Sequence, residues 1–314
     1  MIGDYHQSVL LNEVLKILEG VGIRGKWFLD ATLGDGGYAL EILQKGGRII
    51  GVDVDPQALE RSKQRFEEEK IAPDRYRLLQ GNFARINNLI QQTDTEDLKF
   101  AGAILDLGVS SLQLEVPERG FSFSKNGPLD MRMDPTLQVA ALDLINGLNK
   151  GELYELFNKL GEEQLAKALA DAVVGARGIR KIETTTQLAD LVTGVYRRFG
   201  LFRPKIPARL ATRSVAGRHP ATKVFQALRI AVNDELNALK EGLPQILGKI
   251  EKNGVILVTC FHSLEDRIVK TTFIKWQDNG FGQVLTNKPI VPSEEEIIRN
   301  PRSRSAKLRV FKKT

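Results

Sequence analysis

The chain has 314 residues and a mass of 35.0 kDa, which is enough for one large domain or two. Hydrophobic residues make up 42% of it and charged residues 27%, so composition excludes a disordered chain and favours a globular protein with a real core. The formal net charge of +6 and a pI near 9.3 permit a polyanionic partner without requiring one.

Cysteine and histidine are scarce. The single cysteine, Cys260, excludes an internal disulfide and a multi-cysteine zinc site, and fits a reducing compartment. His6, His219 and His262 show no ligand spacing, so we predict no protein-bound catalytic metal. No apolar stretch approaches the ~18 residues that span a bilayer, and the start lacks a secretory pattern. We therefore expect a cytoplasmic protein with no membrane partner.

Short apolar runs alternate with helical patterns from Lys26 onward. Such runs, apolar on both faces and separated by helices, predict a parallel sheet with helices on both sides. The predicted strands are residues 27–31, 48–53, 75–80 and 100–106, and the predicted helices are residues 38–44 and 56–70.

The alternation of strands and helices stops at residues 108–135, which are rich in Gly, Pro, Ser and Asp and predict a long loop of the kind that is usually functional or disordered. Residues 140–199 have helical periodicity, with Thr186 as a candidate N-cap. After Pro220 the pattern predicts a helix, a strand and a helix, at residues 221–240, 254–261 and 264–276. The predicted fold is a doubly wound α/β domain, residues 1–112 and 217–314, with residues 113–216 inserted as a loop and a helical domain.

A glycine-rich turn joins the first strand to the first helix. Gly34, Gly36 and Ala39 satisfy the G-x-G-x-x-A dinucleotide pattern, and Asp53 follows the next strand where a ribose-binding acid belongs. Asp30, four residues before Gly34, suits a cationic group such as the sulfonium or amino group of S-adenosylmethionine. The turn therefore favours a methyl donor over a nicotinamide cofactor.

Candidate catalytic residues follow two later strands. Asp106 ends the fourth strand, at the edge where ligands of open α/β sheets bind, and Ser110 lies just beyond it. His262 and Ser263 follow the later strand, although Ser263 is also a candidate helix cap. Cys260 could serve as a nucleophile, but a lone cysteine in an apolar strand is more often packing, which we favour.

Several long motifs occur together in one order. They are residues 5–11, 30–37 (DATLGDGG), 105–111 (LDLGVSS), 118–123 (ERGFSF), 127–135 (GPLDMRMDP), 219–222 (HPAT), 225–230 (FQALRI), 261–270 (FHSLEDRIVK) and 300–304 (NPRSR). Together they resemble the bacterial RsmH (MraW) family, and the resemblance covers nearly the whole chain.

The resemblance implies an S-adenosylmethionine-dependent methyltransferase of the N4 amine of a cytidine in 16S ribosomal RNA, with a class I methyltransferase (Rossmann-like) fold carrying a helical insertion. The cofactor contacts that it implies are Gly36, Gly37, Tyr38, Asp53, Phe83, Asp106 and Gln113. Tyr38 stands where the family commonly has His, which leaves open whether that side chain has a role. For catalysis we expect Asp106 to accept hydrogen bonds from the amine, assisted in orientation by Ser110, His262 or Asp266.

The basic residues are concentrated. Residues 191–233 and 299–314 contain no Asp or Glu but carry nine and seven cations, so the remainder of the chain is acidic. We expect these segments and the 118–135 loop to hold RNA, the loop through its cations and its soft apolar groups Phe121, Phe123, Met131 and Met133. The candidate RNA-binding residues are Arg119, Arg132, Arg213, Arg218, Arg229, Arg302 and Arg304.

The expected partner is 16S ribosomal RNA within the small ribosomal subunit, and a homodimer is compatible with the sequence. Two other classes remain open. A nicotinamide-dependent oxidoreductase would bind NAD instead of S-adenosylmethionine, and a non-catalytic RNA-binding assembly factor would bind RNA without methylating it.

Overall fold

The computed structural model describes residues 5, 7–93, 97–201 and 219–314. Its centre is a seven-stranded sheet in the order β3-β2-β1-β4-β5-β7-β6. The strands are β1 (Trp27–Asp30), β2 (Arg48–Asp53), β3 (Tyr76–Gln80), β4 (Phe100–Asp106), β5 (Ile250–Cys260), β6 (Gly282–Val284) and β7 (Lys307–Lys313). β1 to β5 are parallel, and β7 runs antiparallel to both β5 and β6. The predicted doubly wound α/β sheet is confirmed.

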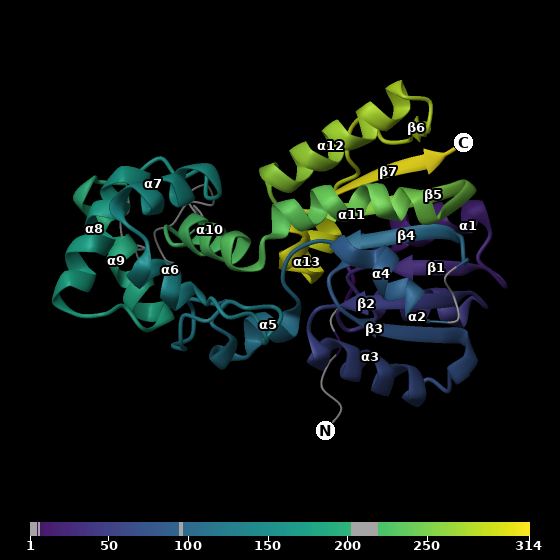
Figure 1. Cartoon of the computed structure of the whole chain (residues 1–314), viewed down its shortest axis with the longest axis horizontal. Helices are drawn as coiled ribbons and strands as arrows, with labels where there is room; N and C mark the ends of the chain where they lie inside the picture. The colour runs from purple at the N-terminus through teal and green to yellow at the C-terminus, as the bar shows by residue number, and fades with distance from the viewer. Residues whose placement is uncertain (1–4, 6, 94–96, 202–218) are drawn as a thin grey trace. The chain divides into compact units, whose positions relative to one another are not determined.

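The chain divides into two compact units, Met1–Ser110 with Leu236–Thr314, and Ser111–Glu235. The first unit contains the sheet (Figure 1). Its helices are α1 (Leu11–Val21), α2 (Gly37–Gln44), α3 (Pro56–Glu68), α4 (Ile86–Gln91), α12 (Ser263–Asp278), α13 (Glu294–Arg299) and all but the first residue of α11 (Glu235–Lys249), with short 3-10 turns η1 (Pro73–Arg75), η2 (Phe83–Arg85) and η4 (Pro301–Ser305).

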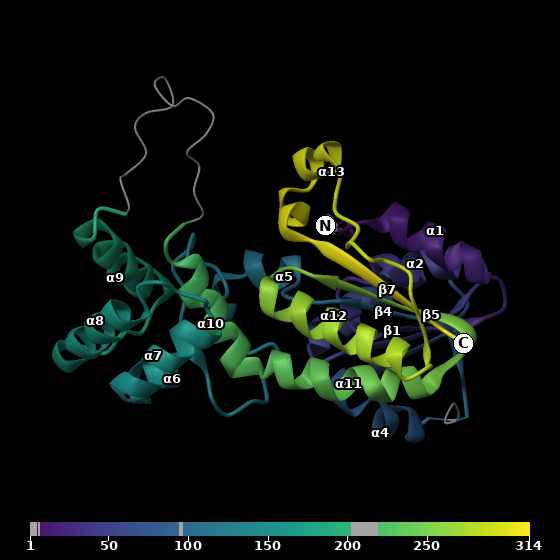
Figure 2. The ribbon, with the colours of Figure 1, turned by 90° about the horizontal axis from the view of Figure 1, so that it is seen from above.

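Two hydrophobic clusters sandwich the sheet. One packs α1, α2 and α3 against one face, to which Phe28 and Ile49 point, and the other packs α4, α11 and α12 against the opposite face, to which Leu29 and Ile50 point. Figure 2 shows α1 and α2 on one side of the strands and α11 and α12 on the other. Adjacent strand residues alternate between faces, and both faces are covered, so the central strands β1 and β4 are buried along most of their length.

The second unit is helical. Its elements are α5 (Ser111–Glu115), η3 (Pro117–Arg119), α6 (Ala141–Gly147), α7 (Lys150–Lys159), α8 (Ala166–Ile179), α9 (Thr185–Arg198) and α10 (Thr222–Asn233). α7 packs against α8 and α10, and α8 also packs against α9. None of the described helices is long and apolar enough to cross a membrane.

Three local expectations were wrong. The helix expected at 221–240 is two helices, because Asp234 adopts a left-handed conformation (φ 49°) between α10 and α11. The boundary between the two compact units falls next to this break, at 235/236, whereas residues 113–216 are the predicted insertion. The cap of α9 is Thr184, whose hydroxyl accepts from the Gln187 backbone N–H, and not Thr186. The loop expected at 108–135 contains α5 and η3.

Candidate active site at the carboxyl edge of the sheet

Three aspartates end three neighbouring strands. Asp30 ends β1 and is paired in register with Gly51 of β2 and Ile104 of β4. Asp53 and Asp106 each lie two residues further along their own strands, at the carboxyl edge of the sheet. Carboxyl ends of parallel strands are where open α/β sheets bind their ligands. The predicted acids therefore come together at one edge of the first unit.

The glycine turn between β1 and α2 closes over this edge. Gly34 (φ 53°) and Gly36 (φ 68°) both adopt left-handed conformations, which glycine tolerates without strain. A Cβ on Gly36 would lie 2.9 Å from the ring of Phe66, whereas a Cβ on Gly34 would meet no atom within 4 Å. Gly36 is thus required by packing, while Gly34 presents its backbone to open space that a ligand can occupy.

Asp53 is held in place by the same turn. Its Oδ2 accepts a hydrogen bond from the Gly34 N–H (2.8 Å), and its Oδ1 accepts one from the Asp55 N–H (2.9 Å). Burial raises the pKa of Asp53 to about 6, although these backbone hydrogen bonds oppose the shift. Each carboxylate oxygen can accept a second hydrogen bond, so Asp53 can still receive two ribose hydroxyls.

Asp30 and Asp106 each keep an oxygen that no described group satisfies. Asp30 is fully buried, and its Oδ2 has no hydrogen-bond partner among the described residues. Oδ1 of Asp106 is likewise buried and has no hydrogen-bond partner among the described residues. Burial raises the pKa of Asp30 to about 7. Burial together with the charges of Asp30 and Glu265 raises the pKa of Asp106 to about 8, although a side-chain hydrogen bond with Tyr38 opposes that shift. Unpaired buried acceptors beside one another suit a ligand that brings positive charge and N–H groups.

Tyr38, at the start of α2, faces these acids. Its side chain is buried, and its hydroxyl donates a hydrogen bond to the backbone carbonyl of Val9. Burial, and then the nearby charges of Asp106 and Asp30, raise its pKa far above the usual range. The hydroxyl therefore lies between the acid cluster and the N-terminal segment, in its neutral form.

The other predicted cofactor residues lie on separate elements. Gly37 is the first residue of α2, and Phe83 begins η2 and packs against Gly242 of α11. Gln113 lies in α5 of the second unit. No observation places Phe83 or Gln113 against a ligand, so their cofactor roles stay predictions.

The turn after β5 is built around a residue that sequence reasoning missed. Glu265 is buried, and its Oε2 accepts hydrogen bonds from the backbone N–H groups of Phe261 (2.8 Å) and His262 (3.2 Å). Its Oε1 lies 3.0 Å from Nε2 of His262. The side chain of His262, not that of Ser263, caps α12. The sequence His262-Ser-Leu-Glu265 has the spacing of a capping box, and this spacing could have identified Glu265 from the sequence.

Asp266 points into an ion pair instead of the acid cluster. Its carboxylate accepts hydrogen bonds from Arg309 Nε (2.5 Å) and Lys307 Nζ (3.2 Å) of β7. Burial raises the pKa of Asp266, but these two cations outweigh burial and lower it below the usual value. This geometry gives Asp266 a structural task, and its assisting role in catalysis stays a prediction. Ser110 follows β4 and Gly108 and is half-buried.

Cys260 is fully buried in β5, and burial raises the pKa of its thiol well above the usual value. A protonated thiol without solvent access is a poor nucleophile. The expectation that Cys260 is packing is confirmed.

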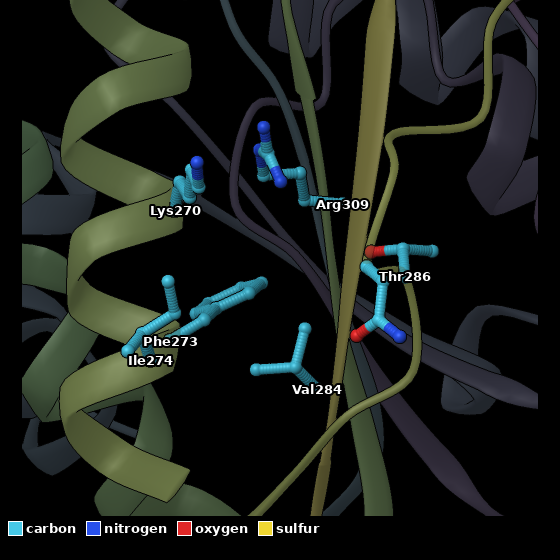
Figure 3. Close-up of a pocket in the computed structure, with 7 residues that line it drawn as sticks. Lys270, Phe273, Ile274, Val284, Thr286 and Arg309 are labelled. Atoms are coloured by element: carbon cyan, nitrogen blue, oxygen red, sulfur yellow. The ribbon is translucent and has the colours of Figure 1, made fainter. Parts of the chain in front are cut away.

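A small pocket in the first unit is distinct from the acid cluster. It lies between α12 and the segment around β6 and β7 (Figure 3), with Lys270, Phe273 and Arg309 among its lining residues. None of the three aspartates at the strand ends lines it.

The candidate RNA-binding arginines have mixed environments. Arg119 donates to the carbonyls of Arg132 and Met133, and Arg132 pairs with Asp130 at 2.6 Å. Arg229 forms a two-bond ion pair with Glu235 (2.8 Å each). Arg302 and Arg304 are exposed on η4, and Arg213 and Arg218 lie outside the described residues.

The expectation that the apolar groups of the loop all hold a nucleotide was wrong for two of them. Phe121 and Met131 are buried, and Met131 is fixed through its backbone by Arg119 and Asn233. The C-terminal basic segment also differs from expectation, because Arg309 of β7 is buried and forms an ion pair with Asp266 of α12.

The strand order with one antiparallel strand beside β5, and the glycine turn facing an acid after β2, define a class I methyltransferase domain. The chain belongs to the MraW methylase family, whose model matches residues 4–314. It is 43% identical to the protein named ribosomal RNA small subunit methyltransferase H of Persephonella marina, over 98% of this chain and 99% of the relative. Proteins of the same name from Synechococcus sp. (46%; 97% of this chain, 91% of theirs) and Sulfurihydrogenibium sp. (42%; 97% and 98%) are similar to it.

Proposed function

We propose that this protein transfers a methyl group from S-adenosylmethionine to the N4 amine of a cytidine in 16S ribosomal RNA. The observation that carries the proposal is the pair of unsatisfied buried carboxylate oxygens, on Asp30 and Asp106, beside the glycine turn. The names of the full-length relatives, ribosomal RNA small subunit methyltransferase H, support the substrate class.

The residues at the strand ends fit this cofactor by chemistry. Asp53 would hold the ribose hydroxyls, and the Gly34 backbone would approach the ligand closely because no side chain blocks it. Asp30 would lie near the positive charge. When bound, S-adenosylmethionine supplies an electrophilic methyl group on a sulfonium cation. That positive charge favours the ionised form of the neighbouring carboxyls.

Asp106 would act on the amine of the RNA base. The lone pair of the cytosine amine is delocalised into the ring, so the amine must be oriented and must lose a proton as its nitrogen gains a carbon. The unpartnered Oδ1 of Asp106 can accept one N–H of the amine and then take its proton. The target base would have to leave its stack to enter the site.

RNA binding would use the exposed cations of η4, Arg302 and Arg304, with the helical unit 111–235 as a further contact. Association with an assembled small subunit, formation of a homodimer and a cytoplasmic location belong to the same proposal. Because phosphate contacts release counterions, RNA affinity should fall steeply with salt.

The decisive experiment incubates the protein with S-adenosylmethionine and either naked 16S RNA or assembled small subunits, followed by mass analysis of the nucleosides. A cytidine that gains one methyl group on N4 supports the proposal. RNA binding without product would favour a non-catalytic assembly factor, and a thermal shift with NAD but not with S-adenosylmethionine would favour an oxidoreductase.

Variants separate the two roles of the acids. Asp106→Asn should lower the single-turnover rate about 10²-fold or more at saturating cofactor, since general base catalysis supplies about that much. Asp53→Ala should mainly raise the cofactor concentration needed. Equal losses at saturating cofactor would contradict this division.

A further inference from the structure

The segment Gln7–Leu10 lies against the start of α2. A Cβ on Gly37 would come within 2.1 Å of the Ser8 hydroxyl oxygen, so the Ser8 side chain lies directly against the backbone of Gly37. The next residue, Val9, accepts a hydrogen bond from the Tyr38 hydroxyl through its carbonyl. The segment therefore contacts the end of the glycine turn at two successive residues.

The opposite side of the segment is held by α13 and the residue after it. The Leu10 N–H donates to Oε1 of Glu296 (2.7 Å), and Nδ2 of Asn300 donates to the Gln7 carbonyl (3.2 Å). Leu10 itself is fully buried in a left-handed conformation (φ 53°) that a leucine adopts only when its surroundings hold it there. Residues nearly 300 positions away in sequence thus fix the segment.

Tyr38 connects this segment to the acid cluster. Its hydroxyl is near enough to Asp106 and Asp30 for their charges to act on it, and it donates to Val9 on its other side. A phenylalanine would fill the same buried space but would leave the Val9 carbonyl without this donor.

We infer that Tyr38 is a positioning residue that holds Gln7–Leu10 against the start of α2 and so makes this segment one wall of the cofactor site. The inference rests on the proposed S-adenosylmethionine site. It assigns the Tyr38 side chain a task that does not require contact with the cofactor. Loss of the hydroxyl should loosen the wall and speed cofactor release more than it changes the methyl-transfer step.

The test compares full-length Tyr38→Phe with Tyr76→Phe. Tyr76 lies on β3 in the same unit and packs edge-on against Phe66, so its substitution controls for the removal of a tyrosine hydroxyl at a position away from the N-terminal segment. Tyr38→Phe should release S-adenosylhomocysteine about 3- to 10-fold faster, the effect of one lost hydrogen bond, and should raise KM for S-adenosylmethionine by a larger factor than it changes kcat. Amide exchange at residues 9–11 should accelerate while that of α3 stays the same.

Glu296→Ala releases the same segment from its other side. It should also raise KM for S-adenosylmethionine. In the double variant with Tyr38→Phe, KM should rise by less than the product of the two single effects, because both substitutions loosen the same segment. Release rates equal to wild type in both single variants would overturn this inference alone. A wild-type protein that binds neither S-adenosylmethionine nor S-adenosylhomocysteine would overturn the proposed function together with it.

Discussion

Replacing Asp30 with asparagine should stabilise the protein without cofactor while weakening cofactor binding. Asp30 is fully buried, and one of its oxygens lacks a partner among the described residues. Asparagine has nearly the same shape, keeps an acceptor for the Thr32 N–H that now lies 3.4 Å from Oδ1, and carries no charge to bury.

The magnitude follows from the pKa. Burial raises the pKa of Asp30 from 3.8 to about 7, so the folded state retains a proton that the unfolded state releases. The stability of the wild type therefore falls as pH rises from about 4 to about 7, and the loss is complete above the folded pKa. At about 1.4 kcal/mol per pKa unit, the loss reaches at most about 4 kcal/mol at pH 8, and the asparagine variant escapes it.

Urea denaturation at pH 5 and pH 8, each with and without S-adenosylmethionine, measures both effects. The stability difference between variant and wild type should widen from pH 5 to pH 8, and the variant should show a smaller cofactor-induced gain. Asp74→Asn, at an exposed position, is the matched control and should change neither quantity. A variant that is less stable than wild type at pH 8 would refute the reasoning, because it would mean that the buried charge is already compensated.

Further outcomes follow from the same structure. Affinity for S-adenosylmethionine should rise between pH 6.0 and 7.5, by up to about tenfold per pH unit for each carboxyl that must ionise, and a pH-independent Kd in titration calorimetry would contradict this. Gly36→Ala should cost about 3 kcal/mol or more, because the added Cβ meets the Phe66 ring in a left-handed backbone; an unchanged urea midpoint would show that the turn can relax. Arg309→Met should destabilise by about 3 kcal/mol since it leaves Asp266 half-buried and weakly paired, whereas wild-type stability would mean that Lys307 suffices. Cys260→Ala should retain methyl transfer, and complete loss of activity in a folded variant would revive a nucleophilic role.

The strands of the sheet centre could be predicted because burial on both faces makes them continuously apolar. The predicted bounds of β2 and β4 coincide with the observed ones. α1 could not be located in this way, because its N-cap, Leu10, offers no side-chain cap and takes a left-handed conformation. The break at Asp234 likewise lacks the glycine or proline that normally marks one.

β7 shows a different reason for failure. Its sequence, KLRVFKK, carries four cations and was interpreted as part of a basic RNA-binding segment. Arg309 is buried there only because Asp266 of α12 neutralises it, and no local pattern reveals that pairing. In the candidate site, too, some features could be predicted from local sequence and others could not. Strand-end positions predicted the aspartates, but unpaired oxygens and the role of Glu265 depend on contacts between distant segments.

The position of β7 also constrains the order in which the sheet can assemble. β6 precedes β7 along the chain, yet its only strand neighbour in the described sheet is β7, which lies between β5 and β6. β6 therefore cannot join the sheet when it is synthesised, because β7 must first pair with β5. Until residues 307–313 have been synthesised, the backbone N–H and C=O groups along the outer edge of β5 have no strand to pair with. During that interval the nascent chain exposes a long apolar strand edge, which is the stage at which aggregation or chaperone capture would compete with folding.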